Sequence, residues 1–225
     1  KVPCAFVGHT MADDIPLEPD QAAARDALEL AQDIPVLALL PGSRGGEISM
    51  LLEIFLQSAE KVSKEMTDLQ VVIPAVNATR KKQIEDYLSE NQINANITIL
   101  AGQAREAMIA SDAILMASGT ATLEAMLCKR PMIAAYRLKW FTHQLMKWLY
   151  KAKFFALPNL LADELLVPEL LQEEVNPDNI SSQLLDLMTG KTRQDMQKFT
   201  DVHMSLKQHA DQQSAKAVLE LIDAS

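Results

Sequence analysis

The chain has 225 residues, of which 48% are hydrophobic and 23% charged, a composition that is ordinary for a globular protein with a sizeable core. Its net charge of −9 argues against nonspecific binding of nucleic acid over the surface. No apolar run approaches the length of a transmembrane helix, and we expect no signal peptide. The cysteines, Cys4 and Cys128, lack metal-ligand spacing, so we expect reduced thiols and assign them no chemistry.

The chain opens at residues 1–7 with what reads as a short strand already under way, and a polar turn follows at residues 8–13. His9 in that turn is a candidate catalytic group, although a lone histidine in a turn more often makes a structural hydrogen bond. A helix is predicted over residues 21–32. Because the chain does not open on Met, we expect a longer protein whose first half is missing here.

The most informative stretch is an unbroken apolar run over residues 36–40, followed by the sequence PGSRGGE and then by apolar residues at helical spacing. It predicts a strand buried on both faces, a glycine turn and a helix. Glycines let a ligand approach the backbone, N–H groups at the helix start point outward, and Arg44 adds donors, so the turn suits a diphosphate. Because it matches no established nucleotide motif, the turn alone equally fits a tight connection with a solvated arginine.

Strands and helices then alternate along the chain. Strands are predicted over residues 69–74, 97–100, 112–116 and 132–136, with helices over residues 77–90 and 104–110. Such alternation implies an α/β fold with a parallel, Rossmann-like sheet and helices on both faces. Ligands of such sheets bind at the carboxyl ends of the strands, where residues 41–46 and the loop with Gln103 lie.

A second candidate site follows the strand at residues 112–116, where Ser118, Gly119 and Thr120 precede a helix. Ser118 or Thr120 can cap this helix, and the small residues allow a ligand to approach its first turn. Glu124, one turn further, can accept hydrogen bonds from a ribose. The alternative is a capped helix in which Glu124 merely lies near the positive end of the helix dipole.

The segment between residues 125 and 162 reverses the charge of the chain, since it has seven basic residues and no acidic one. Most of the aromatic residues gather there as well. This pattern favours contact with an anionic membrane surface or an amphiphilic phosphorylated substrate, although a core-facing helix with solvated lysines is the alternative. The predicted membrane contacts are Trp140, Phe141, Lys147, Trp148, Lys151 and Lys153.

Three further residues are candidates for the ligand site. Asn159 follows a proline at the end of what reads as a short apolar strand, which is a ligand-facing position. Glu169 and Gln172 are predicted to share one helix face, which either contacts a nucleotide sugar or is solvated. Residues 177–225 read as helices with polar faces and carry no motif.

Five motifs carry a resemblance to a known family. They are VGH with MAD at residues 7–13, LPGSR at 40–44, ASGTA with Glu124 at 117–124, LPNLLA at 157–162 and ELLQ at 169–172. Their order and spacing cover nearly the whole chain, which resembles the C-terminal half of the lipid-A-disaccharide synthase family. The sequence departs from the family at residues 162–164, Ala-Asp-Glu, where a glycine and a basic residue are expected.

The resemblance implies a Rossmann-like C-terminal domain of a GT-B glycosyltransferase over residues 1–175 and C-terminal helices over residues 176–225 that pack on this domain or on a partner. An N-terminal acceptor domain, which holds the general base in the family, would lie outside this chain. The resemblance places Gly42, Ser43 and Arg44 at the diphosphate of a UDP-sugar, supported by the helix that starts at Ser118, Gly119 and Thr120. Glu124 would hold the ribose, Gln103 would lie near the uracil, and Asn159, Glu169 and Gln172 would face the sugar or diphosphate.

The implied reaction transfers 2,3-diacylglucosamine, with inversion, from its UDP conjugate to 2,3-diacylglucosamine 1-phosphate in lipid A biosynthesis. Its products are the β-1,6-linked disaccharide phosphate and UDP, and no metal or other cofactor is expected. We expect a cytoplasmic protein, peripheral on the inner face of the bacterial inner membrane, that associates as a homodimer and binds no nucleic acid. Two alternatives stay open: a UDP-sugar-binding module without catalysis, and an epimerase of similar fold acting on UDP-N-acetylglucosamine, which would need no surface for acyl chains.

Overall fold

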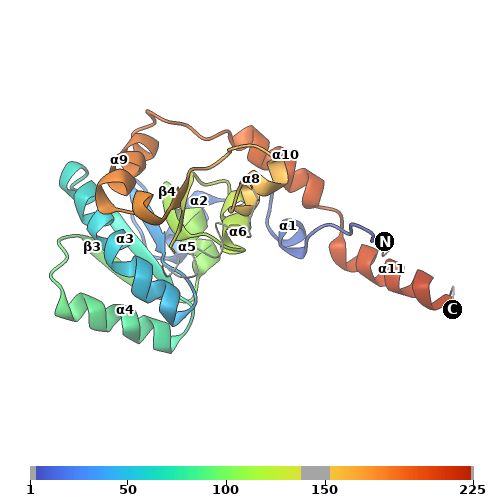
Figure 1. Ribbon diagram of the computed structural model, residues 1–225, viewed down its shortest axis with the longest axis horizontal. Helices are drawn as coiled ribbons and strands as arrows, with labels where there is room; N and C mark the ends of the chain where they lie inside the picture. Colours follow the sequence, from blue (N-terminus) through green and yellow to red (C-terminus); the bar gives the residue numbers. More distant parts are fainter. Residues whose placement is uncertain (1–3, 138–152, 224–225) are drawn as a thin grey trace.

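The computed structural model describes residues 4–137 and 153–223, which fold into a parallel sheet between two layers of helices (Figure 1). The sheet has six strands in the order β3-β2-β1-β4-β5-β6, and all neighbouring strands pair in parallel. The strands are β1 (Val36–Leu40), β2 (Gln70–Ala75), β3 (Asn96–Ala101), β4 (Ala113–Ala117), β5 (Met132–Tyr136) and β6 (Glu169–Leu171). This is the strand order of the Rossmann fold, which confirms the predicted class.

Strand β1 lies at the centre of the sheet and is covered on both sides. Val36 and Ala38 belong to one hydrophobic core, whereas Leu37 and Leu39 belong to the other, and all four are fully buried. A strand covered on both faces needs no polar alternation, which explains its unbroken apolar sequence.

Helices cover the two faces of the sheet and form two separate cores with it. One core contains residues of α3 (Gly45–Glu65), α4 (Ala78–Glu90) and α9 (Pro177–Met188). The other contains residues of α1 (Thr10–Asp14), α2 (Gln21–Ala27), α5 (Ala104–Ala110), α6 (Ala121–Leu127) and α10 (Met196–Leu206), with α8 (Leu157–Ala162) packed against it. Because α9 and α10 each join one core, these two C-terminal helices pack on the sheet domain.

The start of the chain differs from the prediction. Residues 4–9 form no strand, and the predicted polar turn contains α1, which His9 caps by accepting a hydrogen bond from the Met11 N–H at Nδ1 (3.2 Å). Helix α2 ends well short of residue 32. The reason is that Glu29 adopts a left-handed conformation, and the Arg25 guanidinium donates to the carbonyl of Gln32 beyond the helix.

Helix α11 (Ala210–Asp223) extends away from the sheet and lies near the N-terminal end of the described chain (Figure 1). Its first turn is held by Asp13, whose carboxylate accepts hydrogen bonds from the N–H groups of His209 (3.0 Å) and Ala210 (2.6 Å). Further along, its exposed apolar side chains are Val218, Leu219, Leu221 and Ile222. Within residues 4–137 and 153–223, no helix is both long enough and apolar enough to span a membrane.

Candidate functional site

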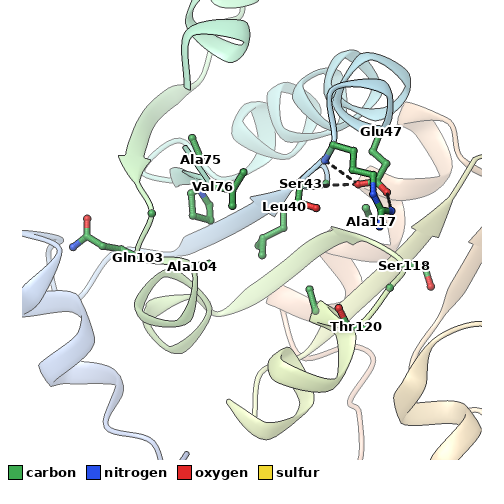
Figure 2. Close-up of a pocket in the computed structure, with 16 residues that line it drawn as sticks. Leu40, Ser43, Glu47, Ala75, Val76, Gln103, Ala104, Ala117, Ser118 and Thr120 are labelled. Atoms are coloured by element: carbon green, nitrogen blue, oxygen red, sulfur yellow. Dashed lines mark hydrogen bonds and ion pairs between the residues drawn. The ribbon is translucent and has the colours of Figure 1, made fainter. Parts of the chain in front are cut away.

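A cavity of about 540 Å³ opens at the carboxyl ends of β1, β2, β3 and β4 (Figure 2). The order of the strands reverses between β1 and β4, and ligands of open α/β sheets bind at such a reversal. The volume is typical of sites for small molecules. The predicted site residues that line the cavity are Gly42, Ser43, Arg44, Gln103, Ser118, Gly119 and Thr120.

The loop between β1 and α3 makes its tight turn at Gly42. The φ angle of this residue is 120°, a backbone conformation that residues other than glycine rarely adopt. A Cβ atom at this position would also lie only 2.6 Å from the Cβ of Glu47. The turn therefore requires glycine, and it directs the chain from β1 into α3 with Arg44 as the N-cap residue.

Glu47, in the first turn of α3, is a cavity residue that the sequence interpretation missed. Its Oε2 accepts hydrogen bonds from the N–H groups of Ser43 (3.1 Å) and Arg44 (3.2 Å), and its Oε1 accepts one from the Arg44 guanidinium at 2.8 Å (Figure 2). Two backbone N–H groups of the loop thus donate to one carboxylate, which shows that the geometry of the loop suits an anion. The sequence does carry a signal for this role, because Glu47 lies three positions after the N-cap Arg44 and an acidic residue at that position is typical of a capping box.

The Arg44 side chain lies at the open side of the cavity and is 83% exposed. Its ion pair with Glu47 is therefore a surface pair, and such pairs contribute at most about 1 kcal/mol. The guanidinium can exchange this carboxylate for another anion at little cost in free energy.

The loop between β4 and α6 forms another wall of the cavity. Thr120 is the N-cap of α6, but its side chain makes no capping hydrogen bond, so its predicted capping role is wrong. Instead, the Thr122 hydroxyl donates to the Gly119 carbonyl at 2.7 Å and accepts from the Leu157 N–H at 3.2 Å. Thr122 thus fixes the loop, while Thr120 lines the cavity and does not cap the helix.

Gln103 lies at the opposite end of the cavity from Glu47. It adopts a left-handed conformation with φ of 57° directly after Gly102, and it precedes α5. Figure 2 shows its side chain extending away from Ser43 and Glu47. A ligand that spans the cavity would therefore have its anionic end at Ser43 and its other end near Gln103.

Glu124 is not among the residues that line the cavity. Its Oε1 accepts a hydrogen bond from the Arg105 Nε at 2.9 Å, which links α6 to α5. This hydrogen bond raises the pKa of the Arg105 guanidinium. The structure therefore gives Glu124 a protein partner, and its contact with a ribose stays a prediction.

Asn159 lies inside helix α8, not at the end of a strand, and it is fully buried. The predicted strand is wrong because Pro158 occupies the first turn of a helix, where proline is well tolerated. The Asn159 Oδ1 accepts from the N–H groups of Leu166 (2.7 Å) and Val167 (2.9 Å), and its Nδ2 donates to the Val167 carbonyl (2.9 Å) and the Glu169 carboxylate (2.7 Å). These bonds use the full capacity of the amide, so Asn159 has a structural role here.

Glu169 and Gln172 do not share a helix face, so that prediction is wrong. Glu169 lies in β6, whereas Gln172 begins a short 3-10 helix (Gln172–Glu174). The Glu169 carboxylate accepts hydrogen bonds from the N–H groups of Phe155 and Ala156, both at 2.8 Å. It therefore fixes the segment that enters α8, and neither Glu169 nor Gln172 lines the cavity.

The predicted membrane contacts fall mostly outside the described residues. Lys153 is described: it is exposed, and its ammonium lies 4.7 Å from the ring centroid of Phe154. The predicted contacts that lie outside the described residues are Trp140, Phe141, Lys147, Trp148 and Lys151.

The candidate His9 has a structural role, and the two cysteines are free thiols. Besides capping α1, His9 donates its backbone N–H to the Leu206 carbonyl at 2.9 Å. Cys4 is exposed and Cys128 is buried, both as free thiols, and burial raises the pKa of the Cys128 thiol to about 12. Over the described ranges, 4–137 and 153–223, no group of three or more His, Cys, Asp or Glu side chains is placed to hold a metal ion.

The fold is that of a class of domains, the Rossmann-like domains of GT-B glycosyltransferases. A glycosyltransferase from Rickettsia africae matches with a TM-score of 0.59 at 10% identity, covering 91% of this chain and 52% of that chain. The ADP-heptose LPS heptosyltransferase II of E. coli matches with a TM-score of 0.53 at 16% identity, covering 76% of this chain and 51% of that chain. At such low identity, these similarities establish the fold alone.

Sequence comparison identifies the family. The family model for lipid-A-disaccharide synthetase matches residues 1–222, and the chain belongs to this family. The lipid-A-disaccharide synthase of Alteromonas mediterranea is 54% identical over 223 residues, and that of Salmonella paratyphi B is 51% identical over 222. These matches cover 97% and 98% of this chain but 58% of each relative, so the chain spans little more than half of their length. Family membership argues against the epimerase alternative.

Proposed function

We propose that this chain supplies the donor-binding domain of a lipid-A-disaccharide synthase. The whole enzyme would transfer 2,3-diacylglucosamine from its UDP conjugate to 2,3-diacylglucosamine 1-phosphate, giving the lipid A disaccharide 1-phosphate and UDP. The observation that carries the proposal is the cavity at the strand-order reversal. There, two N–H groups of the β1–α3 loop donate hydrogen bonds to the Glu47 carboxylate.

In this proposal the diphosphate binds at the N-terminus of α3, where the helix dipole and outward N–H groups favour negative charge. The Arg44 guanidinium exchanges Glu47 for a phosphate, as its exposure allows. The nucleoside then extends across the cavity toward Gln103, past the wall formed by Ser118 and Thr120.

The transfer itself places two demands on the enzyme. An acceptor hydroxyl oxygen bonds to C1 of the donor sugar, the bond from C1 to the β-phosphate oxygen breaks, and the configuration inverts. Negative charge develops on the departing UDP, and the loop amides with Arg44 would stabilise it without a metal. The hydroxyl proton passes to a general base. Among the described residues that line the cavity, Glu47 is the only carboxylate, and it is bound to the loop, so we place the base outside this set.

Calorimetric titration of the chain with UDP, in buffer that contains EDTA, tests the donor site. We expect metal-independent binding that Arg44→Ala weakens by about tenfold or more, because hydrogen bonds to charged groups are strong. Lys64→Ala is the matched control, since Lys64 is exposed in the last turn of the same helix. A folded chain that does not bind UDP, or an Arg44→Ala variant that binds like the wild type, would contradict the proposal.

The alternative of a UDP-sugar-binding module without catalysis concerns the 225 residues alone. The lack of a free carboxylate among the described residues of the cavity favours it for this chain in isolation. We expect the chain to bind UDP but to transfer no sugar when donor and acceptor are supplied. Measurable transfer by the chain alone would show that its base lies within these 225 residues.

We also propose that the enzyme acts at the inner face of the inner membrane, because both substrates would carry acyl chains. The charge reversal over residues 125–162 and the exposed Lys153 support this proposal. In liposome flotation with anionic lipid, replacing Lys147, Lys151 and Lys153 by Glu should abolish binding, whereas replacing the exposed Lys82 by Glu should not. Flotation that is unchanged by the triple replacement would rule out this surface.

A further inference from the structure

A second guanidinium lies at the N-terminus of α3, and it comes from a different helix. Arg80 is in the first turn of α4, and a Cβ atom at Gly45 would collide with its Nη1 and lie 3.2 Å from its Cζ. Gly45 is the first residue of α3, directly after Arg44, and its φ angle is not one that requires glycine. The missing side chain at Gly45 therefore leaves the space that the Arg80 guanidinium fills.

The Arg80 guanidinium is held in this place by hydrogen bonds. Its Nη1 donates to the Gln83 Oε1 at 2.6 Å, and the Gln83 Nε2 donates to the Gly45 carbonyl (3.2 Å) and the Ser49 hydroxyl (3.1 Å) of α3. The backbone is fixed as well, because the Arg80 N–H donates to the side chain of the N-cap residue Asn77 at 3.0 Å. Gln83 thus connects the guanidinium to the first turn of α3.

The charges at this helix terminus do not balance. Arg44 is paired with Glu47, whereas Arg80 takes part in no ion pair within residues 4–137 and 153–223, and its partner Gln83 is neutral. A cation at the N-terminus of a 21-residue helix is repelled by the helix dipole. An anionic ligand at this terminus would remove that repulsion and give the second guanidinium a partner.

We infer that Arg80 binds the diphosphate of the UDP-sugar from the α4 side, while Arg44 and the loop amides bind it from the β1–α3 side. The inference rests on the proposed donor function and adds a binding residue to it. Val76, in the short connection from β2 to α4, lines the cavity, whereas Arg80 itself does not, so its guanidinium would reach the diphosphate from the rim of the site. Two guanidinium groups on different helices would share the two negative phosphates.

Calorimetric titration of the chain with UDP and with uridine tests the inference. Arg80→Gln should weaken UDP binding by about tenfold or more and leave uridine binding within about twofold, because only UDP carries the phosphates. Arg80→Lys should recover part of the loss, since it keeps the charge but not the fork of donors. Lys82→Gln is the matched control, because it removes the same charge from an exposed position on the same helix.

The outcomes separate this inference from the function on which it rests. If Arg44→Ala weakens UDP binding but Arg80→Gln binds UDP within about twofold of the wild type, the inference is wrong and the donor site stands. Equal losses for UDP and uridine in Arg80→Gln would show a merely structural role and also overturn it. If the wild type does not bind UDP, the proposed function fails and the inference fails with it.

Discussion

Glu47 shows how a single side chain can organise an anion site. Its two carboxylate oxygens hold the N–H groups of Ser43 and Arg44 and the Arg44 guanidinium. These donors are therefore already oriented before any ligand enters, and pre-oriented donors cost little reorganisation when charge develops nearby. The close packing of Glu47 against Gly42 makes the turn and the carboxylate depend on each other.

Replacing Gly42 by Ala should damage both stability and ligand binding. The new Cβ would lie 2.6 Å from the Glu47 Cβ, in a residue with φ of 120°. A strained backbone of this kind costs about 1–3 kcal/mol, which urea unfolding would measure. The shifted turn would also move the N–H groups of Ser43 and Arg44, so UDP binding should weaken in the same variant. Gly46→Ala is the control, because nothing lies within 4 Å of the added Cβ. Equal behaviour of the two variants would show that the turn does not depend on Gly42.

At the scale of elements, one buried amide connects α8 to β6. Asn159 reaches the backbone of residues 166–167 and the carboxylate of Glu169, which in turn accepts from the N–H groups of the segment that precedes α8. Strand β6 has three residues, lies at the edge of the sheet and pairs with β5 on one side. The amide therefore fixes the segment that leads into β6, in addition to the pairing of this short strand with β5.

Asn159→Ala should lower the free energy of unfolding by about 2–4 kcal/mol, because it leaves several buried polar groups without partners. Differential scanning calorimetry and urea unfolding would measure the loss. Gln213→Ala, at an exposed position on α11, should change stability by less than about 0.5 kcal/mol. A stable Asn159→Ala variant with weakened UDP binding would instead restore the ligand-facing role that the sequence suggested.

The elements differ in how far the sequence predicts them. The runs that became β1 and β5 are mostly apolar and each directly follows a proline, so local pattern was enough. The short helix α1 was missed because its stability comes from a histidine cap and from contacts with α10, nearly 200 residues away in the chain. Arg80 and Gly45 are 35 positions apart, and no local pattern indicates that they meet.

At the scale of the whole molecule, His203 connects three segments that lie far apart in the chain. It is fully buried in α10, its Nε2 lies 2.8 Å from the Ala12 carbonyl, and its Nδ1 lies 2.6 Å from the Lys129 ammonium. The Lys207 ammonium also donates to the Ala12 carbonyl, at 3.1 Å. Neutral His203 satisfies both neighbours, since it donates to the carbonyl and accepts from Lys129, whereas a charged imidazolium would face two cations.

The stability of the protein should fall as the pH drops from about 7.5 to about 5.5. Burial lowers the pKa of His203, and the charges of Lys129 and Lys207 lower it further. The histidine in the unfolded chain therefore takes up a proton near pH 6.5, whereas His203 in the folded protein resists protonation. The contribution of neutral His203 to the free energy of unfolding is complete above that pH and is lost as the pH falls below it. Urea midpoints across this range should vary less in His203→Gln than in the wild type. The exposed control His209→Gln should keep the wild-type dependence, and an unchanged slope in His203→Gln would contradict the assignment.

The contacts between α1 and the α10–α11 junction have a topological consequence. Residues 8–13 lie against residues 203–210 through backbone, ammonium and carboxylate hydrogen bonds. These hydrogen bonds connect the segment that precedes the first strand with the segment that follows the last one. A circular permutant opened in the loop at residues 91–95, between α4 and β3, would keep every strand pairing and every wall of the cavity. The site would then depend on how the elements are arranged in space and not on their order along the chain.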